Sequence, residues 1–94
     1  MIELGGNIKL VGFSNIEPAL LIVVKKITGN YVKKMSDKLG KDIEELKLEL
    51  KDETGQKKVI GELRFNSKIE NAESINLNLF FALDKVLGTF LEKT

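Results

Sequence analysis

A strand is predicted near the start of the chain, over residues 2–13, from an alternating pattern in residues 7–12. Ile8 and Leu10 lie at every second position, the pattern of a strand with one buried face. Gly5 and Gly6 fall inside the predicted strand. Because glycine weakens regular strand pairing, the two residues predict a bulge or a bend within a single strand.

Three further strands are predicted in the second half of the chain. Leucine occupies every second position of residues 46–50 and alternates with charged residues. Apolar or small residues recur in the same way over residues 59–65, and a weaker alternation covers residues 69–75. Turns are expected between these strands, at residues 52–56 and at residues 66–68, because both stretches are polar and the first contains glycine.

Two helices are predicted from apolar residues spaced three and four apart. The first covers residues 17–39, begins with a proline suited to a first turn and ends before Gly40. The second covers residues 78–92, and Asn76 or Asn78 can cap its start. On the first helix, the predicted apolar face comprises Leu20, Leu21, Val24, Ile27, Tyr31, Val32, Met35 and Leu39.

The predicted element order is β-α-β-β-β-α, in a single domain that covers residues 1–94. Each helix has one apolar stripe and each strand has one apolar face. Two helices packed on one face of a four-stranded sheet bury all of these surfaces at once. With 43% hydrophobic and 31% charged residues, the composition is typical of a folded domain with one core. The expected class is therefore α+β.

The chain contains neither cysteine nor histidine. Without cysteine, disulfides and thiolate chemistry are excluded. Without histidine, the chain lacks the side chain most used for proton transfer near neutral pH and for zinc binding. We therefore expect no enzyme activity, no cofactor and no metal. The longest apolar run, residues 19–24, is far shorter than the roughly 20 residues of a membrane span. We expect no membrane partner and a cytoplasmic location.

The net charge is only +1, but the charges are sorted by segment. Residues 25–41 carry six lysines against one aspartate, a net charge of +5. Residues 42–53 carry six carboxylates against two lysines, a net charge of −4. Residues 54–68 carry four basic side chains against one glutamate, a net charge of +3. One surface of the folded chain can therefore be strongly basic although the whole chain is nearly neutral.

The basic helix is the main candidate for a functional surface, because lysines along a helix can neutralise phosphates of a nucleic acid. Basic residues of the central hairpin can extend that surface. A solvated helix face with no partner is the alternative, since exposed lysines are common on helices. The candidate RNA-binding residues are Lys25, Lys26, Lys33, Lys34, Lys38, Lys58 and Arg64.

Other polar and aromatic groups are given structural interpretations. The acid-rich segment 42–53 alternates with lysines, which is more typical of cross-strand ion pairs than of a cation site. Phe80 and Phe90 lie on the apolar stripe of the last helix and are expected to be packed. Phe81 falls nearer the edge of that stripe. It is the one aromatic side chain left open as a base-stacking residue.

Two stretches of the chain resemble the ribosome hibernation-promoting factor family, which includes the ribosome-associated translation inhibitors. Residues 6–10, Gly-Asn-Ile-Lys-Leu, are similar to the first strand of that family. Ala72-Glu73 and then residues 78–85, Asn-Leu-Phe-Phe-Ala-Leu-Asp-Lys, resemble its last strand and the start of its last helix. The order and lengths of the elements agree too, so the resemblance covers essentially the whole chain.

The resemblance implies a fold similar to double-stranded-RNA-binding domains, with no catalytic residue and no cofactor. Proteins of that family bind the small ribosomal subunit near the decoding centre, block messenger and transfer RNA, and silence idle ribosomes. By resemblance, the partner is small-subunit ribosomal RNA. The family contacts RNA largely through basic residues on its helices and the adjoining sheet edge, the region that holds Lys25, Lys26, Lys33 and Lys34 here.

The chain departs from the family pattern in two respects. Its second helix offers only Lys85 and Lys93, and no C-terminal dimerisation domain follows Thr94. An alternative function is therefore a protein-interaction or homo-oligomerisation module with the same fold and no RNA role. In a homodimer, the basic helix would pair with the acidic segment 42–53 of a second copy, or open sheet edges would pair. A small-molecule-binding or catalytic domain fits the composition less well.

Overall fold

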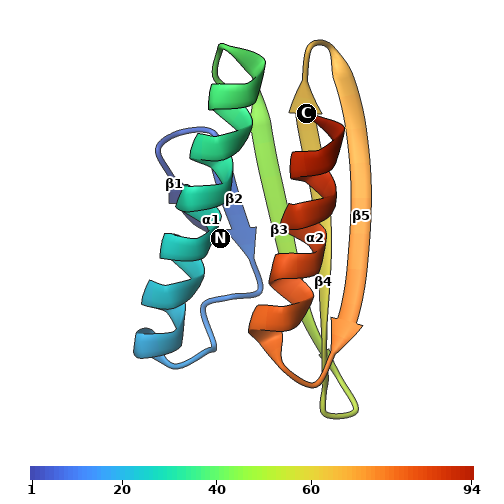
Figure 1. Cartoon of the computed structure of the whole chain (residues 1–94). Coiled ribbons are helices and arrows are strands. Elements are labelled where there is room, and N and C mark those ends of the chain that lie inside the picture. The colour runs from blue at the N-terminus through green and yellow to red at the C-terminus, as the bar shows by residue number, and fades with distance from the viewer.

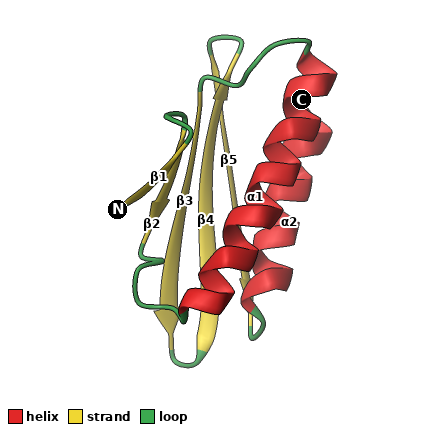
Figure 2. Ribbon diagram, turned by 90° about the vertical axis from the view of Figure 1, so that its left-hand side faces the viewer, coloured by secondary structure: helices red, strands yellow, loops and turns green.

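Two helices lie side by side on one face of a single sheet (Figure 1). In the computed structural model, which describes residues 1–94, the elements are β1 (Ile2–Leu4), β2 (Ile8–Val11), α1 (Pro18–Leu39), β3 (Glu45–Glu53), β4 (Gln56–Phe65), β5 (Lys68–Asn76) and α2 (Leu79–Lys93). The strands follow the order β1-β2-β3-β4-β5, in which only β2 and β3 are parallel. The predicted α+β class, with both helices on one face, is confirmed (Figure 2).

The prediction of a single strand over residues 2–13 is wrong. These residues contain a hairpin in which β1 pairs antiparallel with β2, so the sheet has five strands and not four. Gly5 and Gly6 both have positive φ, +60° and +81°. Two successive residues in this region reverse the chain, whereas a bulge would only have bent it. The glycine pair therefore ends one strand and starts the next.

Both helices begin and end within one residue of their predicted bounds. Pro18 occupies the first turn of α1, although no side chain caps that end. Gly40 ends the helix in the left-handed conformation, and its N–H donates to the carbonyl of Ser36 at 2.9 Å. At α2, the side chain of Asn78 accepts from the backbone N–H groups of Phe80 and Phe81 at 2.8 and 3.4 Å, as predicted.

The core lies between the sheet and the two helices. Alternate residues of β2, β3 and β4 face it, among them Leu10, Leu48 and Leu63, which are fully buried. The backbone of β4 comes close to α2 at Gly61. A Cβ atom there would lie 2.7 Å from side-chain carbons of both Val86 and Phe90. Gly61 therefore sets how closely α2 packs on the sheet.

The first half of α1 is less buried than its apolar sequence predicts. Leu20, expected in the core, is 37% exposed, and Ile22 is 67% exposed. The sheet under this part of the helix is narrow, because β1 and β2 are short.

Neither helix of the protein is both long and apolar enough to cross a membrane.

Candidate nucleic-acid interface

No carboxylate forms an ion pair with a lysine of α1. Five were predicted to bind RNA: Lys25, Lys26, Lys33, Lys34 and Lys38. All five are exposed, and none lies within 4.0 Å of an acidic group. The five ion pairs of the molecule are all formed by basic residues of other elements. The net positive charge of this helix is therefore available to an anionic partner.

The five lysines are not all on one side of α1. Successive residues turn by roughly 100° around a helix, so Lys26 and Lys33 lie opposite the buried stripe of Val24, Thr28 and Met35. Lys34 flanks them on the side of α2, where it lines the groove described below. These three residues form one contiguous surface, which we call the α1 lysine surface.

The other two lysines of α1 stand apart from that surface. Lys25 projects from the opposite flank of the helix, away from α2. Lys38 lies beside α2 and donates from Nζ to the carbonyl oxygen of Leu91 at 2.6 Å. Of the five candidates on this helix, the structure therefore brings three together and leaves two at its margins.

Lys58 and Arg64 lie on the far face of the sheet. On β4, Val59, Leu63 and Phe65 are buried toward the helices, and the alternating residues point the other way. Lys58 Nζ lies 3.7 Å from Glu73 Oε2, and Arg64 Nε lies 3.4 Å from Glu62 Oε1. The expectation that the hairpin extends the basic surface of the helix is therefore wrong. Any role of these two residues in RNA binding stays a prediction.

The open face of the sheet is electrostatically balanced. Lys9 Nζ on β2 lies 3.0 Å from Glu45 Oε2 on β3, and the hydrogen bond from Lys9 lowers the pKa of the Glu45 carboxyl. On the other face, which the helices cover, Lys57 pairs with Asp52 at the end of the β3–β4 hairpin. Cross-strand ion pairs, as predicted for the acidic segment, form at Glu45 and Asp52, and no carboxylate of the segment forms an ion pair with a lysine of α1.

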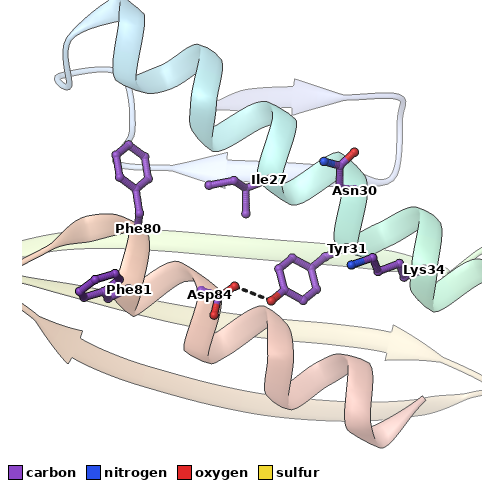
Figure 3. Close-up of a pocket in the computed structure, with 7 residues that line it drawn as sticks. All are labelled: Ile27, Asn30, Tyr31, Lys34, Phe80, Phe81 and Asp84. Carbon is purple, nitrogen blue, oxygen red and sulfur yellow. Dashed lines mark hydrogen bonds between the residues drawn. The ribbon is translucent and has the colours of Figure 1, made fainter.

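A groove runs between α1 and α2 and has a volume of about 430 Å³. Figure 3 shows the hydroxyl of Tyr31 reaching from α1 to the carboxylate of Asp84 on α2, to which it donates a hydrogen bond. The residues that line the groove are Ile27, Asn30, Tyr31, Lys34, Phe80, Phe81 and Asp84. The groove opens beside the α1 lysine surface, because Lys34 belongs to both.

The contact between Tyr31 and Asp84 fixes the two helices to each other at the groove. The hydrogen bond to Asp84, followed by burial and the negative charge of the carboxylate, raises the pKa of Tyr31 from 10.0 to about 12. Lys34 Nζ lies 5.6 Å from the centroid of the same ring, within the range of a cation–π interaction. Tyr31 therefore remains a neutral hydrogen-bond donor across the physiological range.

The three phenylalanines of α2 divide as predicted. Phe90 is fully buried, and Phe80 is partly buried against the core. Phe81 is 67% exposed at the end of the groove farther from Lys34 (Figure 3). It is the most exposed aromatic side chain of the protein and is free to contact a partner.

The groove is the part of the site that the sequence did not predict. Tyr31 was assigned to the apolar face of the helix, and Asp84 was not singled out. A half-buried tyrosine usually finds a partner for its hydroxyl, which is a signal that some partner exists. No pattern in the sequence identifies that partner, because Asp84 lies 53 residues away.

The structure also has no cluster of acidic side chains that could hold a metal ion.

The fold is shared with two solved structures. The Thermus thermophilus Protein Y N-terminal domain superposes with a TM-score of 0.68 at 14% identity, over 92% of this chain and 90% of that chain. A ribosomal subunit interface protein from Coxiella burnetii superposes with a TM-score of 0.62 at 15% identity, over 93% and 89%. The predicted resemblance is confirmed at the level of the fold. No protein-family model and no curated protein sequence matches the chain.

Proposed function

We propose that this protein is a ribosome-associated factor of the hibernation-promoting type, which binds small-subunit ribosomal RNA and inhibits translation in idle ribosomes. Three exposed lysines on the outward side of α1, none of which forms an ion pair, carry the proposal. The fold adds support, because a protein of the same fold is described as a ribosomal subunit interface protein. Within the same proposal, the protein works in the cytoplasm and has no catalytic step.

The physical basis is the release of counterions from RNA. Each ammonium group that replaces a counterion at a phosphate adds affinity, and this affinity falls as salt rises. Lys26, Lys33 and Lys34 reach phosphates from one side of a rigid helix, so their contacts form together. Lys25 or Lys38 at the margins of the surface supplies one further contact if the RNA curves around the helix.

Co-sedimentation with small ribosomal subunits tests this proposal. The test variant is K26Q/K33Q/K34Q, and the control is K47Q/K51Q/K68Q, which loses the same charge from three exposed lysines outside the helices. We expect the test variant to lose on the order of a hundredfold in affinity at about 0.1 M salt, since three phosphate contacts disappear. The control should keep most of the binding, because none of its lysines belongs to α1.

Inhibition of translation is the second readout. Wild-type protein and the control variant should inhibit a reconstituted translation reaction, and K26Q/K33Q/K34Q should not. Thermal unfolding of the three proteins shows whether each is folded. Equal subunit binding by all three proteins, or wild-type binding that does not respond to salt, would contradict the proposal.

Self-association is a second candidate function, favoured by one edge of the sheet. The outer side of β5 has no partner strand over nine residues, whereas β1 at the other edge is only three residues long. A long open edge can pair with the same edge of a second copy. Light scattering over a range of concentrations tests this. A monomer at high concentration would rule out a stable homodimer, and replacing Asn71 by proline should dissolve any dimer that forms through β5.

A further inference from the structure

The groove between the helices combines an aromatic end with a cationic end. Phe81, Phe80 and Ile27 provide apolar surface toward the start of α2, and Lys34 lies beyond the Tyr31 ring at the other end (Figure 3). An exposed aromatic ring beside a cationic surface is the arrangement of proteins that bind single-stranded nucleic acid. In such proteins, rings stack on bases while basic side chains follow the backbone.

The groove and the α1 lysine surface are continuous along α1. Asn30 lines the groove and lies four residues after Lys26 and four before Lys34, so the three side chains are neighbours on the helix surface. The amide of Asn30 can both donate and accept hydrogen bonds. The Asp84 carboxylate accepts from Tyr31 and has further lone pairs for a donor such as an exocyclic amino group.

We infer that the groove receives one unpaired nucleobase of the bound RNA, with its ring against Phe81 and the adjoining phosphate at Lys34. This inference rests on the proposed function, because the lysines must first bring RNA to the helices. The groove has a volume of about 430 Å³, which falls within the range of roughly 300–1,000 Å³ that is typical of small-molecule sites. A paired base is unsuited to the groove, since its edge and both its faces are already occupied in the duplex.

Competition between RNA backbone and RNA base separates this inference from the lysine contacts. The probes are a short single-stranded oligoadenylate, an abasic ribose-phosphate chain of the same length and a duplex of the same length, each measured by fluorescence anisotropy. We expect wild-type protein to bind the oligoadenylate about tenfold or more tightly than the abasic chain, the effect of one stacked base. Phe81→Ala should abolish that difference, and Phe81→Trp should retain it.

Two controls keep the result specific to the groove. Ile69→Ala removes a comparably exposed apolar side chain, 55% exposed, from the opposite face of the sheet and should leave all three affinities unchanged. The salt dependence of binding should be the same for wild type and Phe81→Ala, because Phe81 contacts no phosphate. In NMR spectra, the ring signals of Phe81 and Tyr31 should shift on addition of oligoadenylate and not on addition of the abasic chain.

The failures of the two proposals are distinguishable. If wild-type protein binds RNA with strong salt dependence but does not discriminate between oligoadenylate and the abasic chain, the lysine contacts stand and the base site is overturned. Equal binding by wild type and Phe81→Ala would overturn it too. If wild-type protein binds none of the three probes, the proposed function itself is contradicted.

Discussion

Thr28 is buried in the middle of α1, and its hydroxyl has no hydrogen-bond partner. A buried hydroxyl without a partner lowers stability, because it has lost its contacts with water. Replacing Thr28 by valine removes the hydroxyl and keeps the β-branched shape and a similar helix propensity. We expect Thr28→Val to raise the free energy of unfolding by roughly 1 kcal/mol, measured by urea denaturation.

Thr28→Ser provides the matched control for this prediction. Serine keeps the unsatisfied hydroxyl and removes a buried methyl group, so stability should fall by roughly 1 kcal/mol. A loss of stability in Thr28→Val, similar to that in the serine variant, would show that the hydroxyl does form a stabilising contact.

Two glycines should respond in opposite ways to the same substitution. A Cβ atom at Gly61 would meet Val86 and Phe90 at 2.7 Å, whereas one at Gly29 has no heavy atom of another element within 4 Å. Gly61→Ala should therefore lower the free energy of unfolding by about 1–3 kcal/mol through overpacking. Gly29→Ala should raise it by about 1 kcal/mol, because Gly29 lies inside a helix. Equal effects at both sites would show that the close approach of α2 to β4 is not as described.

Tyr31 makes stability depend on pH in the alkaline range. Asp84 raises the pKa of Tyr31 to about 12 in the folded protein. The hydrogen bond between them therefore makes its full contribution to the free energy of unfolding below pH 10. Its contribution should be lost as pH rises from about 10 to about 12. The protein has a single tyrosine, so the absorbance of tyrosinate reports on Tyr31 alone. In Asp84→Asn, the pKa should fall toward its ordinary value. An unchanged pKa in that variant would contradict the assigned cause.

At the scale of elements, α1 was the most predictable part of the molecule. A proline that suits a first turn and a glycine that suits a helix end mark its bounds, and both act through local backbone conformation. The N-terminal hairpin was missed for a related reason. Whether Gly5 and Gly6 bend a strand or reverse it depends on their φ values, and both outcomes leave the same alternation of apolar residues.

The one acidic residue of α1 gives a prediction at this scale. Asp37 is exposed and lies four residues after Lys33 and three after Lys34, yet no lysine pairs with it. Its charge lowers the potential of the α1 lysine surface, so Asp37→Asn should strengthen binding to RNA several-fold at low salt. Glu92→Gln, an equal charge change at an exposed site on α2, should have a smaller effect on affinity measured by anisotropy.

At the scale of the whole molecule, the distribution of charge followed only partly from the sequence. The lysines of α1 could be recognised because they are close in the chain and share a helix. The separation of Lys58 and Arg64 from them could not, because it depends on which face of β4 packs against the helices. Their ion pairs, to Glu73 on β5 and to Glu62 on β4 itself, follow from the same arrangement. The groove depends on the distance between two helices, and no local pattern encodes that distance.

The dependence of RNA affinity on salt concentration tests the central claim most directly. About four phosphate contacts predict a slope near −3 in a plot of log affinity against log salt concentration for wild-type protein. In K26Q/K33Q/K34Q the slope should fall to about −1, because three contacts are removed. K47Q/K51Q/K68Q should keep the wild-type slope. Slopes that are the same in all three proteins would contradict the claim that the α1 lysine surface binds the phosphate backbone.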